Sequence, residues 1–508
     1  MNTIELALFT SRIQSICGEM GAILRYSAFS PNIRDRLDFS CAIFDASGEL
    51  CAQAAHIPVH LGSMAYAMRD IVNRFTWQDG DVLILNDPYL GGTHLPDITL
   101  LAPVFCGDQL LAFAANRAHH ADVGASTPGS MPLAQSIHEE GILIPPGLLC
   151  QNHQLNDAPV AHLYRQVHHP DITRADLSAQ LSSVRKGIAL VWNLIQETGT
   201  SHFLALLAAL NEYAQRLALT GIRAIPAGSY TYKDVMDDDG LGNTDIPIAV
   251  TLQITSDQVI VDFAGTADQV QGNINCPLSV TAAAVYYCFY CLMPAQTPAC
   301  AGSFRPLHLQ APAGSLVNAA APAAVAAGNV ETSTRIVDVI LGALAAAIPD
   351  RIPAASHGSM NNIAMGTSAW DYYETLAGGM GAGPVGPGMH AVQTHMTNTL
   401  NTPIEILEMY YPLRIRQYGI RRHSGGAGRH CGGNGLIREY EFLADSTVTL
   451  LSERRRHAPW GLQGGAPGNP GCNTLNQRSL PGKFTINVKT GDILKTETPG
   501  GGGWGPSP

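Results

Sequence analysis

The sequence Asn-Asp-Pro-Tyr-Leu-Gly-Gly-Thr-His-Leu-Pro-Asp occupies residues 86–97, and Arg-Ala-His-His-Ala-Asp occupies residues 117–122. Two apolar segments, 98–105 and 109–115, run between them and are separated by Cys-Gly-Asp. Gly and Asp tolerate the backbone angles of tight turns, so this pattern predicts a β-hairpin centred near Gly107. The hairpin brings the two polar ends of the stretch together.

The polar residues at the open end of this hairpin form a candidate metal site. Counting outward from the turn places His94 opposite about residue 120 and Asp97 opposite about residue 117. These two side chains then meet His119 or His120, which gives two imidazoles and a carboxylate. That ligand set suits Mn²⁺, Fe²⁺ or Zn²⁺. Spacing alone leaves open a second interpretation, a hydrogen-bonded polar cluster under a loop.

A second hairpin is predicted earlier in the chain. Residues 38–44 and 50–54 have the apolar character of strands and flank a turn centred on Ser47. The same counting places Asp38 opposite His56. Asp38 is then either a base or an orienting group in the metal pocket, or one partner of a plain hydrogen bond at the end of a sheet.

The remainder of the sequence predicts a mixed, multi-domain α+β fold. Apolar spacing indicates helices over 3–27, 171–198 and 201–222, and strands become frequent from about residue 226. The expected parts are a hairpin-rich N-terminal α/β domain with the metal site (1–225), a strand-rich middle domain (226–330) and a Gly-rich α/β C-terminal domain (331–508).

Composition narrows the class of protein. The 508 residues suffice for two to four domains, and only 14% of them are charged, which is typical of a subunit with interfaces rather than a free monomer. The net charge of −11 argues against nucleic acid and anionic membranes as partners. The sequence contains neither a signal-peptide core near its start nor an apolar run of about 18 residues, so a cytoplasmic location is expected.

No nucleotide site is expected in this sequence. The glycine-rich segments 358–366 and 378–383 lack the Gly-Lys-Ser/Thr of a phosphate-binding loop and do not match GxGxxG between a strand and a helix. A run of three arginines at 454–456 adjoins Glu453. This run either binds an anion or forms ion pairs within the protein.

Several motifs, in order along the chain, resemble those of the hydantoinase B/oxoprolinase family, which is related to acetone carboxylase subunits and caprolactamase. Besides the two motifs quoted above, they are Glu-Glu-Gly-Ile-x-Ile-Pro-Pro, Gly-Asn-x-Glu-Thr, Ser-Gly-Gly-Ala-Gly-Arg, Ser-Glu-Arg-Arg and the terminal Thr-Pro-Gly-Gly-Gly-Gly. The resemblance runs from about residue 5 to residue 505.

This resemblance implies a division of labour between two chains. A hydantoinase A-like partner binds ATP and Mg²⁺ and phosphorylates a small-molecule substrate, and the present chain type completes the reaction with a divalent metal inside a hetero-oligomer. Carried over residue by residue, the metal ligands fall on His94, Asp97 and His119, with His120 as the neighbouring alternative. Asp38 matches a family position near the reacting carbon.

The leading hypothesis is therefore the hydrolytic subunit of an ATP-dependent cyclic amidase that opens hydantoin, 5-oxoproline or a lactam. In it, Asp38 or His120 takes the proton from a metal-activated water. The chain is shorter than the carboxylase large subunits, which favours hydrolysis over carboxylation. The alternatives are a bicarbonate-using carboxylase subunit, an Fe²⁺ oxygenase with two His and one carboxylate, and a non-enzymatic scaffold for the ATPase.

Overall fold

The N-terminal part of the protein is built around a seven-stranded antiparallel sheet with strand order β2-β1-β5-β4-β3-β6-β7. The computed structural model describes residues 3–54 and 57–507. The strands of this sheet are β1 (Phe39–Asp45), β2 (Leu50–Gln53), β3 (Val82–Leu85), β4 (Asp97–Cys106), β5 (Gln109–His119), β6 (Gly147–Gln151) and β7 (Gln154–Leu155).

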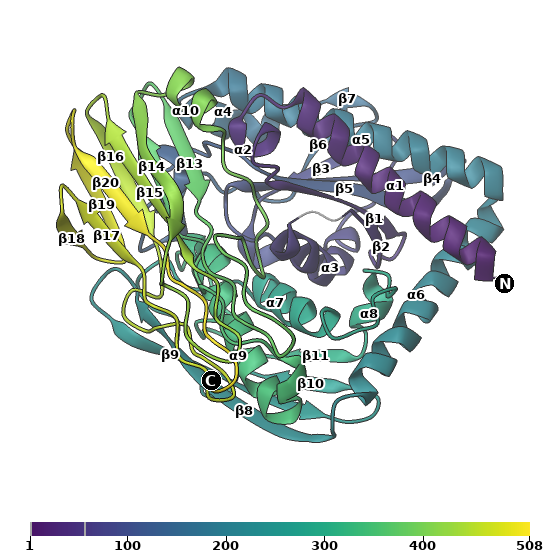
Figure 1. The fold of residues 1–508 in the computed structure, drawn as a ribbon. Coiled ribbons are helices and arrows are strands. Elements are labelled where there is room, and N and C mark those ends of the chain that lie inside the picture. The colour runs from purple at the N-terminus through teal and green to yellow at the C-terminus, as the bar shows by residue number, and fades with distance from the viewer. Residues whose placement is uncertain (1–2, 55–56, 508) are drawn as a thin grey trace.

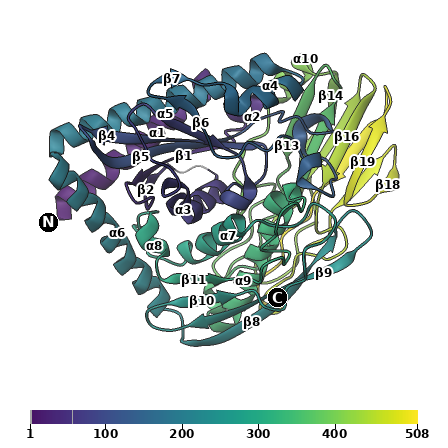
Figure 2. The same ribbon diagram turned by 180° about the vertical axis from the view of Figure 1, so that it is seen from behind.

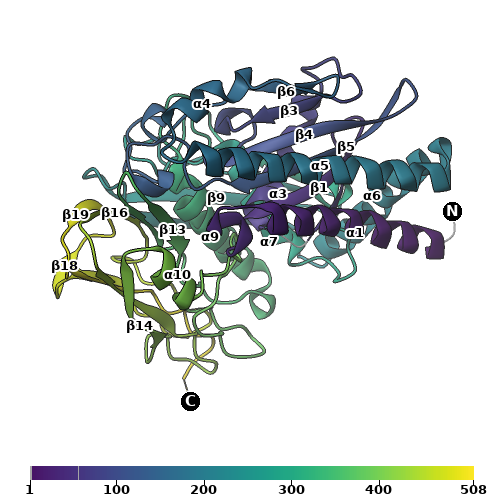
Figure 3. The ribbon, with the colours of Figure 1, turned by 90° about the horizontal axis from the view of Figure 1, so that it is seen from above.

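Helices cover both faces of this sheet. Helices α1 (Thr3–Ser27) and α5 (Pro170–Thr198) lie on one face, and α3 (Pro58–Val72) lies on the other, against α7 (Leu278–Tyr290) (Figures 1 and 3). Because both faces are covered, every position of β3 and the first eight positions of β4 are buried, and β3 is apolar throughout.

Side chains alternate between the two faces as strand geometry requires. Leu83 and Leu85 of β3 join the core shared with α3, whereas Val82 and Ile84 join the core under α1 and α5. The direction of each side chain at the end of a strand therefore depends on whether its position is odd or even.

A second sheet lies beyond the helices. It has strand order β11-β10-β9-β8, and α9 packs on β8 and β9 while it also contacts α7. The helices α3, α7 and α9 thus form a layer between two sheets (Figure 1). The bounds are β8 (Gly228–Asp238), β9 (Thr244–Ile254), β10 (Val259–Asp262), β11 (Leu307–Gln310) and α9 (Ser333–Ala347).

Two further sheets pack face to face at the C-terminal end of the protein, around their own core (Figure 2). The first has order β13-β12-β16-β19, with bounds β12 (Asn362–Gly366), β13 (Asp371–Thr375), β16 (Ser446–Leu451) and β19 (Lys483–Val488). The second has order β14-β15-β20-β17-β18, with bounds β14 (Leu413–Arg421), β15 (Gly435–Phe442), β17 (Cys472–Leu475), β18 (Arg478–Leu480) and β20 (Ile493–Glu497). The remaining α-helices are α2 (Pro31–Arg34), α4 (Ala161–Gln166), α6 (Thr200–Arg223), α8 (Ala301–Phe304) and α10 (Ile404–Tyr410).

The mixed α+β fold predicted from the sequence is confirmed. The helices predicted over 3–27, 171–198 and 201–222 correspond to α1, α5 and α6, with ends that agree within one residue. The division into three domains at residues 225 and 330 stays a prediction. Among the described residues, no helix combines the length and the apolarity that crossing a membrane requires.

A buried carboxyl gives a test of this packing. Glu140 has no exposed surface, and its Oε1 accepts hydrogen bonds from the N–H groups of Val325 and Ala326 at 2.9 and 2.8 Å. Burial raises the pKa of Glu140 from 4.5 to about 8. The unfolded chain loses this proton near pH 4.5, whereas the folded protein keeps it up to about pH 8. The free energy of unfolding therefore falls as the pH rises between these two values.

We therefore predict that Glu140→Gln removes this pH dependence. Between about pH 5.5 and 7.5, the wild type should lose roughly 1 kcal/mol of its free energy of unfolding per pH unit relative to the variant. Urea denaturation at several pH values measures it. Glu139→Gln, at the exposed neighbouring position, serves as the control, and a difference that stays constant for Glu140→Gln would contradict the prediction.

Candidate metal centre

The candidate residues lie in one row across three adjacent strands. Strand β5 lies between β1 and β4, and Asp97, the first residue of β4, pairs with His119, the last residue of β5. On the other side, the His119 N–H donates to the carbonyl oxygen of Asp38 at 3.0 Å. Side chains in one row of a sheet share a face. Asp38, His119 and Asp97 therefore face the same side of the sheet.

The register of the hairpin differs from the predicted one by two residues. Counting from Gly107 placed Asp97 opposite residue 117, but Asp97 pairs with His119. The turn is centred between Gly107 and Asp108, and Leu111 forms a bulge, since Val104 pairs with Ala112 and Phe105 with Leu110. Each feature shifts the register by one residue. Two shifts of one residue leave the side chains on the same face of the sheet as predicted, whereas a single shift would have turned them to the opposite face.

His94 reaches the row from the loop before β4. Gly91 in this loop has a φ of 97°, and a Cβ at this position would lie 2.0 Å from the Cβ of Ala67. Only glycine fits both constraints. The buried Arg117 connects this loop to α3. Its guanidinium donates to the Gly91 carbonyl oxygen at 2.9 Å and to the hydroxyl of Ser63 in α3 at 2.6 Å.

His94, Asp97 and His119 converge on one point. The Nε2 of His94 and the Nδ1 of His119 each lie 3.3 Å from Oδ1 of Asp97. One nitrogen or oxygen atom from each residue lies within 4.8 Å of the other two, and all three side chains are buried. The hydroxyl of Thr93 donates to the other carboxylate oxygen, which fixes the orientation of the carboxylate.

The unpartnered atoms of this group fit a metal ion. Both ring nitrogens of His94, Nε2 of His119 and Oδ1 of Asp97 are buried without a hydrogen-bond partner. Each such atom costs about 1–3 kcal/mol, and a divalent cation would supply the missing interaction for one nitrogen of each ring and for Oδ1 of Asp97. Two imidazoles and one carboxylate can therefore hold a divalent metal here.

The electrostatics of the group agree with this role. Burial raises the pKa of Asp97, but the neighbouring His60 and His94 outweigh burial and hold that pKa well below its ordinary value. Burial lowers the pKa of His119, against the opposing effect of Asp97. An ionised carboxylate and a neutral imidazole are the forms that bind a metal.

His60 is the residue that sequence reasoning missed. It lies in the first turn of α3, and its Nε2 lies 3.0 Å from Oδ2 of Asp97 and 3.9 Å from Oδ1 of Asp38. Pro58, a residue typical of a first helical turn, was the available signal that a helix begins beside the predicted site. His56, the predicted partner of Asp38, lies outside the described residues.

An aromatic wall comes from the C-terminal part of the chain. The ring of Tyr373, in β13, stacks on His119 with centroids 4.8 Å apart and planes 4° from parallel. The guanidinium of Arg36 lies 4.5 Å from the centroid of the Tyr373 ring, and its Nη2 lies 3.9 Å from Oδ2 of Asp38. Tyr373 donates its hydroxyl proton to Oδ1 of Asn362 at 2.6 Å.

Asp38 and the three imidazoles line a cavity of about 20 Å³, which is room for one water molecule. The rest of its wall is mainly apolar side chains and threonines. These residues are Ile57, Val59, Asn329, Val330, Met360, Tyr373, Thr375, Met396, Thr397 and Thr399.

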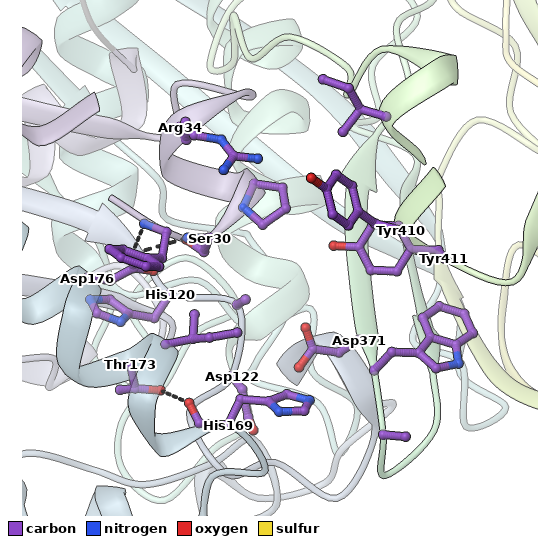
Figure 4. Close-up of a pocket in the computed structure, with 17 residues that line it drawn as sticks. Ser30, Arg34, His120, Asp122, His169, Thr173, Asp176, Asp371, Tyr410 and Tyr411 are labelled. Atoms are coloured by element: carbon purple, nitrogen blue, oxygen red, sulfur yellow. Dashed lines mark hydrogen bonds between the residues drawn. The ribbon is translucent and has the colours of Figure 1, made fainter. Parts of the chain in front are cut away.

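His120 lies apart from this cavity. It follows His119 directly, and the alternation along the strand turns its side chain to the other face, where Nε2 lies 2.8 Å from Oε1 of Gln180 in α5. There it lines a separate pocket of about 330 Å³ with Asp176 and Asp371 (Figure 4). The structure thus groups His94, Asp97 and His119 with Asp38, and places His120 elsewhere.

Comparisons with known proteins agree with this fold. The Hydantoinase B/oxoprolinase family model matches residues 2–507. An uncharacterized protein of Methanocaldococcus jannaschii is 41% identical over 99% of this chain and 91% of its own length. 5-oxoprolinase 1 of Arabidopsis thaliana is 39% identical over 99% of this chain, which spans 42% of that protein's length. The crystal structure of the ATP-dependent caprolactamase from Pseudomonas jessenii has a TM-score of 0.92 and 26% identity, covering 100% of this chain and 91% of that one.

Fold and site together define a mixed α+β protein with a buried cluster of histidine and aspartate at the open end of its central β4–β5 hairpin. The chain belongs to the hydantoinase B/oxoprolinase family, as the motifs in the sequence indicated.

Replacing the two adjacent histidines separately tests the metal site. We predict that His119→Ala lowers bound divalent metal at least about tenfold, because it removes one of three ligands, whereas His120→Ala retains the metal. Elemental analysis after dialysis against Mn²⁺, Zn²⁺ or Fe²⁺ measures this. Equal metal content in the two variants would contradict the assignment.

Proposed function

We propose that this chain is the hydrolytic subunit of an ATP-dependent cyclic amidase acting on a hydantoin, 5-oxoproline or lactam ring. Membership of the family and the similarity to 5-oxoprolinase 1 and caprolactamase support this proposal. One observation carries it: the Asp38 carboxylate adjoins a buried set of three potential metal ligands, at a cavity with room for a single water.

The partner in this proposal is a hydantoinase A-like chain that binds ATP and Mg²⁺. Resonance protects an amide carbonyl from attack by water, and phosphorylation of its oxygen makes the carbon electrophilic. The present sequence contains no phosphate-binding loop, which agrees with a kinase step on the other chain. Hydrolysis of the activated ring then falls to the site described above.

The residues of this chain have distinct parts in the hydrolysis. A divalent cation held by His94, Asp97 and His119 would supply Lewis acidity. Asp38 takes the proton from the attacking water as its oxygen bonds to the ring carbon. Asp38 then passes this proton to the ring nitrogen. As the carbon–nitrogen bond breaks, its electron pair stays on nitrogen, which also takes the proton of the new hydroxyl group. The carbon keeps the phosphoryl group as an acyl phosphate, and a second water cleaves this to a carboxylate and inorganic phosphate.

Neighbouring groups prepare Asp38 for this role. Arg36 is fully buried, and its guanidinium, 3.9 Å from Oδ2 of Asp38, offsets the carboxylate charge. His60 lies between Asp38 and Asp97 and orients both carboxylates. Tyr373 holds the His119 ring by stacking and closes the site to bulk water.

We predict that Asp38→Asn retains the metal but lowers the rate of ATP-dependent ring opening by a factor of about 10²–10⁴, which is the usual contribution of a general base to the rate. The assay uses the complex with the ATPase chain and a panel of hydantoin, 5-oxoproline and caprolactam. Asp371→Asn, in the pocket that contains His120, is the matched control and should retain activity. Ring opening at the wild-type rate by Asp38→Asn would contradict the assigned role.

The same assay separates hydrolysis from carboxylation. A hydrolase needs no bicarbonate and incorporates no labelled carbon into its product. Dependence on bicarbonate, with label in the product, would replace the proposal by the carboxylase alternative.

A further inference from the structure

No residue outside the candidate metal site holds the ring of His119 by a hydrogen bond, within the part of the chain that the structure describes. A metal-binding histidine generally donates its second ring N–H to a carboxylate, a carbonyl oxygen or water, and that hydrogen bond orients the ring. In His119, Nδ1 lies 3.3 Å from Oδ1 of Asp97, which is itself a candidate ligand, and Nε2 is buried without a partner. Another contact therefore has to fix the plane of this ring.

The ring of Tyr373 supplies that contact. It stacks on His119 with centroids 4.8 Å apart and planes 4° from parallel, and both side chains are buried. The lone pair of an imidazole nitrogen lies in the plane of its ring. A stacked neighbour that fixes this plane therefore fixes the direction in which the ligand atom points.

A hydrogen bond from the neighbouring strand holds Tyr373 in turn. Strands β12 and β13 pair antiparallel, and Ala364 of β12 lies opposite Tyr373. Asn362 is two residues from Ala364 and shares its face of the sheet, so it lies diagonally across from Tyr373. The Tyr373 hydroxyl donates to Oδ1 of Asn362 at 2.6 Å. This bond ties the outer end of the stacked ring to β12.

Glu331 fixes the orientation of the Asn362 carboxamide. Oε1 of Glu331 accepts hydrogen bonds from Nδ2 of Asn362 and from the Met360 N–H, both at 3.0 Å. Because Nδ2 is a donor only and faces the carboxyl group, Oδ1 faces the Tyr373 hydroxyl as its acceptor. The side chains of Glu331, Asn362 and Tyr373 are all buried, which protects these bonds from competition with water.

Glu331 belongs to the motif Gly-Asn-x-Glu-Thr, to which the proposed function gives no role. Residues Gly328–Thr332 form a π-helical turn before α9, a feature that occurs often at functional sites. The Gly328 N–H donates to the Asn273 carbonyl at 3.0 Å, and a Cβ on Gly328 would lie 1.8 Å from the Asn275 carbonyl oxygen. The turn therefore packs directly against backbone, and this holds the Glu331 carboxyl group in place.

We propose that Glu331, Asn362 and Tyr373 are positioning residues that set the orientation of His119 and thereby the affinity and the coordination geometry of the metal. The carboxyl group fixes the carboxamide, the carboxamide fixes the phenol, and the phenol fixes the imidazole. This inference rests on the metal site of the proposed function and assigns a role to the Gly-Asn-x-Glu-Thr motif.

Tyr373→Phe tests the central step with Co²⁺ as the probe and the full chain as the protein. The variant retains the aromatic ring but loses the hydroxyl. We expect the affinity for Co²⁺ to fall by about tenfold, as is usual when a group that orients a metal ligand is lost. The visible absorption bands of bound Co²⁺, which report its coordination geometry, should shift.

Tyr372→Phe is the matched control. Tyr372 is the adjacent buried tyrosine of β13, and its hydroxyl donates to Oε2 of Glu374 at 2.9 Å. The control therefore removes an equivalent buried hydrogen bond that has no connection to His119. It should leave the Co²⁺ affinity and the absorption bands unchanged.

A double-mutant cycle tests Asn362. Asn362→Leu has a similar size but no hydrogen-bonding group, and alone it should lower the Co²⁺ affinity about as much as Tyr373→Phe. Combined with Tyr373→Phe it should lower the affinity no further, because both changes remove the same hydrogen bond.

Two substitutions of Glu331 test the first step. Burial raises the pKa of Glu331 from 4.5 to about 8, so Gln matches its neutral side chain at pH 7 and keeps an acceptor oxygen. Glu331→Gln should therefore retain the wild-type absorption bands, whereas Glu331→Leu should shift them in the same way as Asn362→Leu.

The outcomes distinguish this inference from the proposed function. Unchanged affinity and absorption in Tyr373→Phe would overturn the inference, and so would an equal change in Tyr372→Phe or additive effects in the cycle. If the variants behave as expected but the complex with the ATPase chain opens no ring, the inference stands and the proposed function fails. If the wild type binds no Co²⁺, the metal site and the inference fail together.

Discussion

The carboxylate of Asp97 has no exposed surface, and the fold around it compensates for burying that charge. An isolated buried ion costs several kcal/mol, so it persists only with partners arranged around it. Those partners are His60 from a helix, His94 from a loop, Thr93 beside it and His119 from the next strand. Elements that are distant in sequence therefore have to meet at the start of β4.

Buried charges obey the same constraint elsewhere in the protein. Lys483 lies 2.6 Å from Glu453, and Arg335 of α9 lies 3.1 Å from the same carboxylate, with all three side chains buried. Arg454 pairs with Asp234 of β8 at 2.8 Å and with Asp338 of α9. These pairs join the second sheet, α9 and the C-terminal sandwich. For Arg454, the first of the three consecutive arginines, the structure supports ion pairs within the protein.

The sequence contained the parts of the site that depend on local geometry. The turn at Gly107 and the alternation of side chains along two strands were sufficient to bring Asp97 near His119. The predicted register was wrong by two residues, but a shift by an even number of residues leaves each side chain on the same face of the sheet. The choice between His119 and His120 follows from the same alternation, but only once the bulge at Leu111 is known. Bulges have no clear signal in a single sequence.

Contacts between sheets lay beyond local reasoning. Tyr373 is more than 250 residues from His119 in the chain, and no periodicity links them. His60 and Asn329 enter the cavity from a helix start and a π-helical turn, whose positions depend on the packing of the layers. Tertiary packing, rather than any property of these segments alone, decides where such side chains point.

The residues that complete the wall of the cavity come from the C-terminal half of the sequence and are therefore synthesised last. The row of Asp38, Asp97 and His119 is complete in the chain long before Tyr373 and the segment 396–399 are synthesised. Closure of the cavity therefore waits for the C-terminal part of the chain to pack on the N-terminal sheet. A cation held by His94, Asp97 and His119 would exchange with solvent only when these C-terminal segments move away from the sheet.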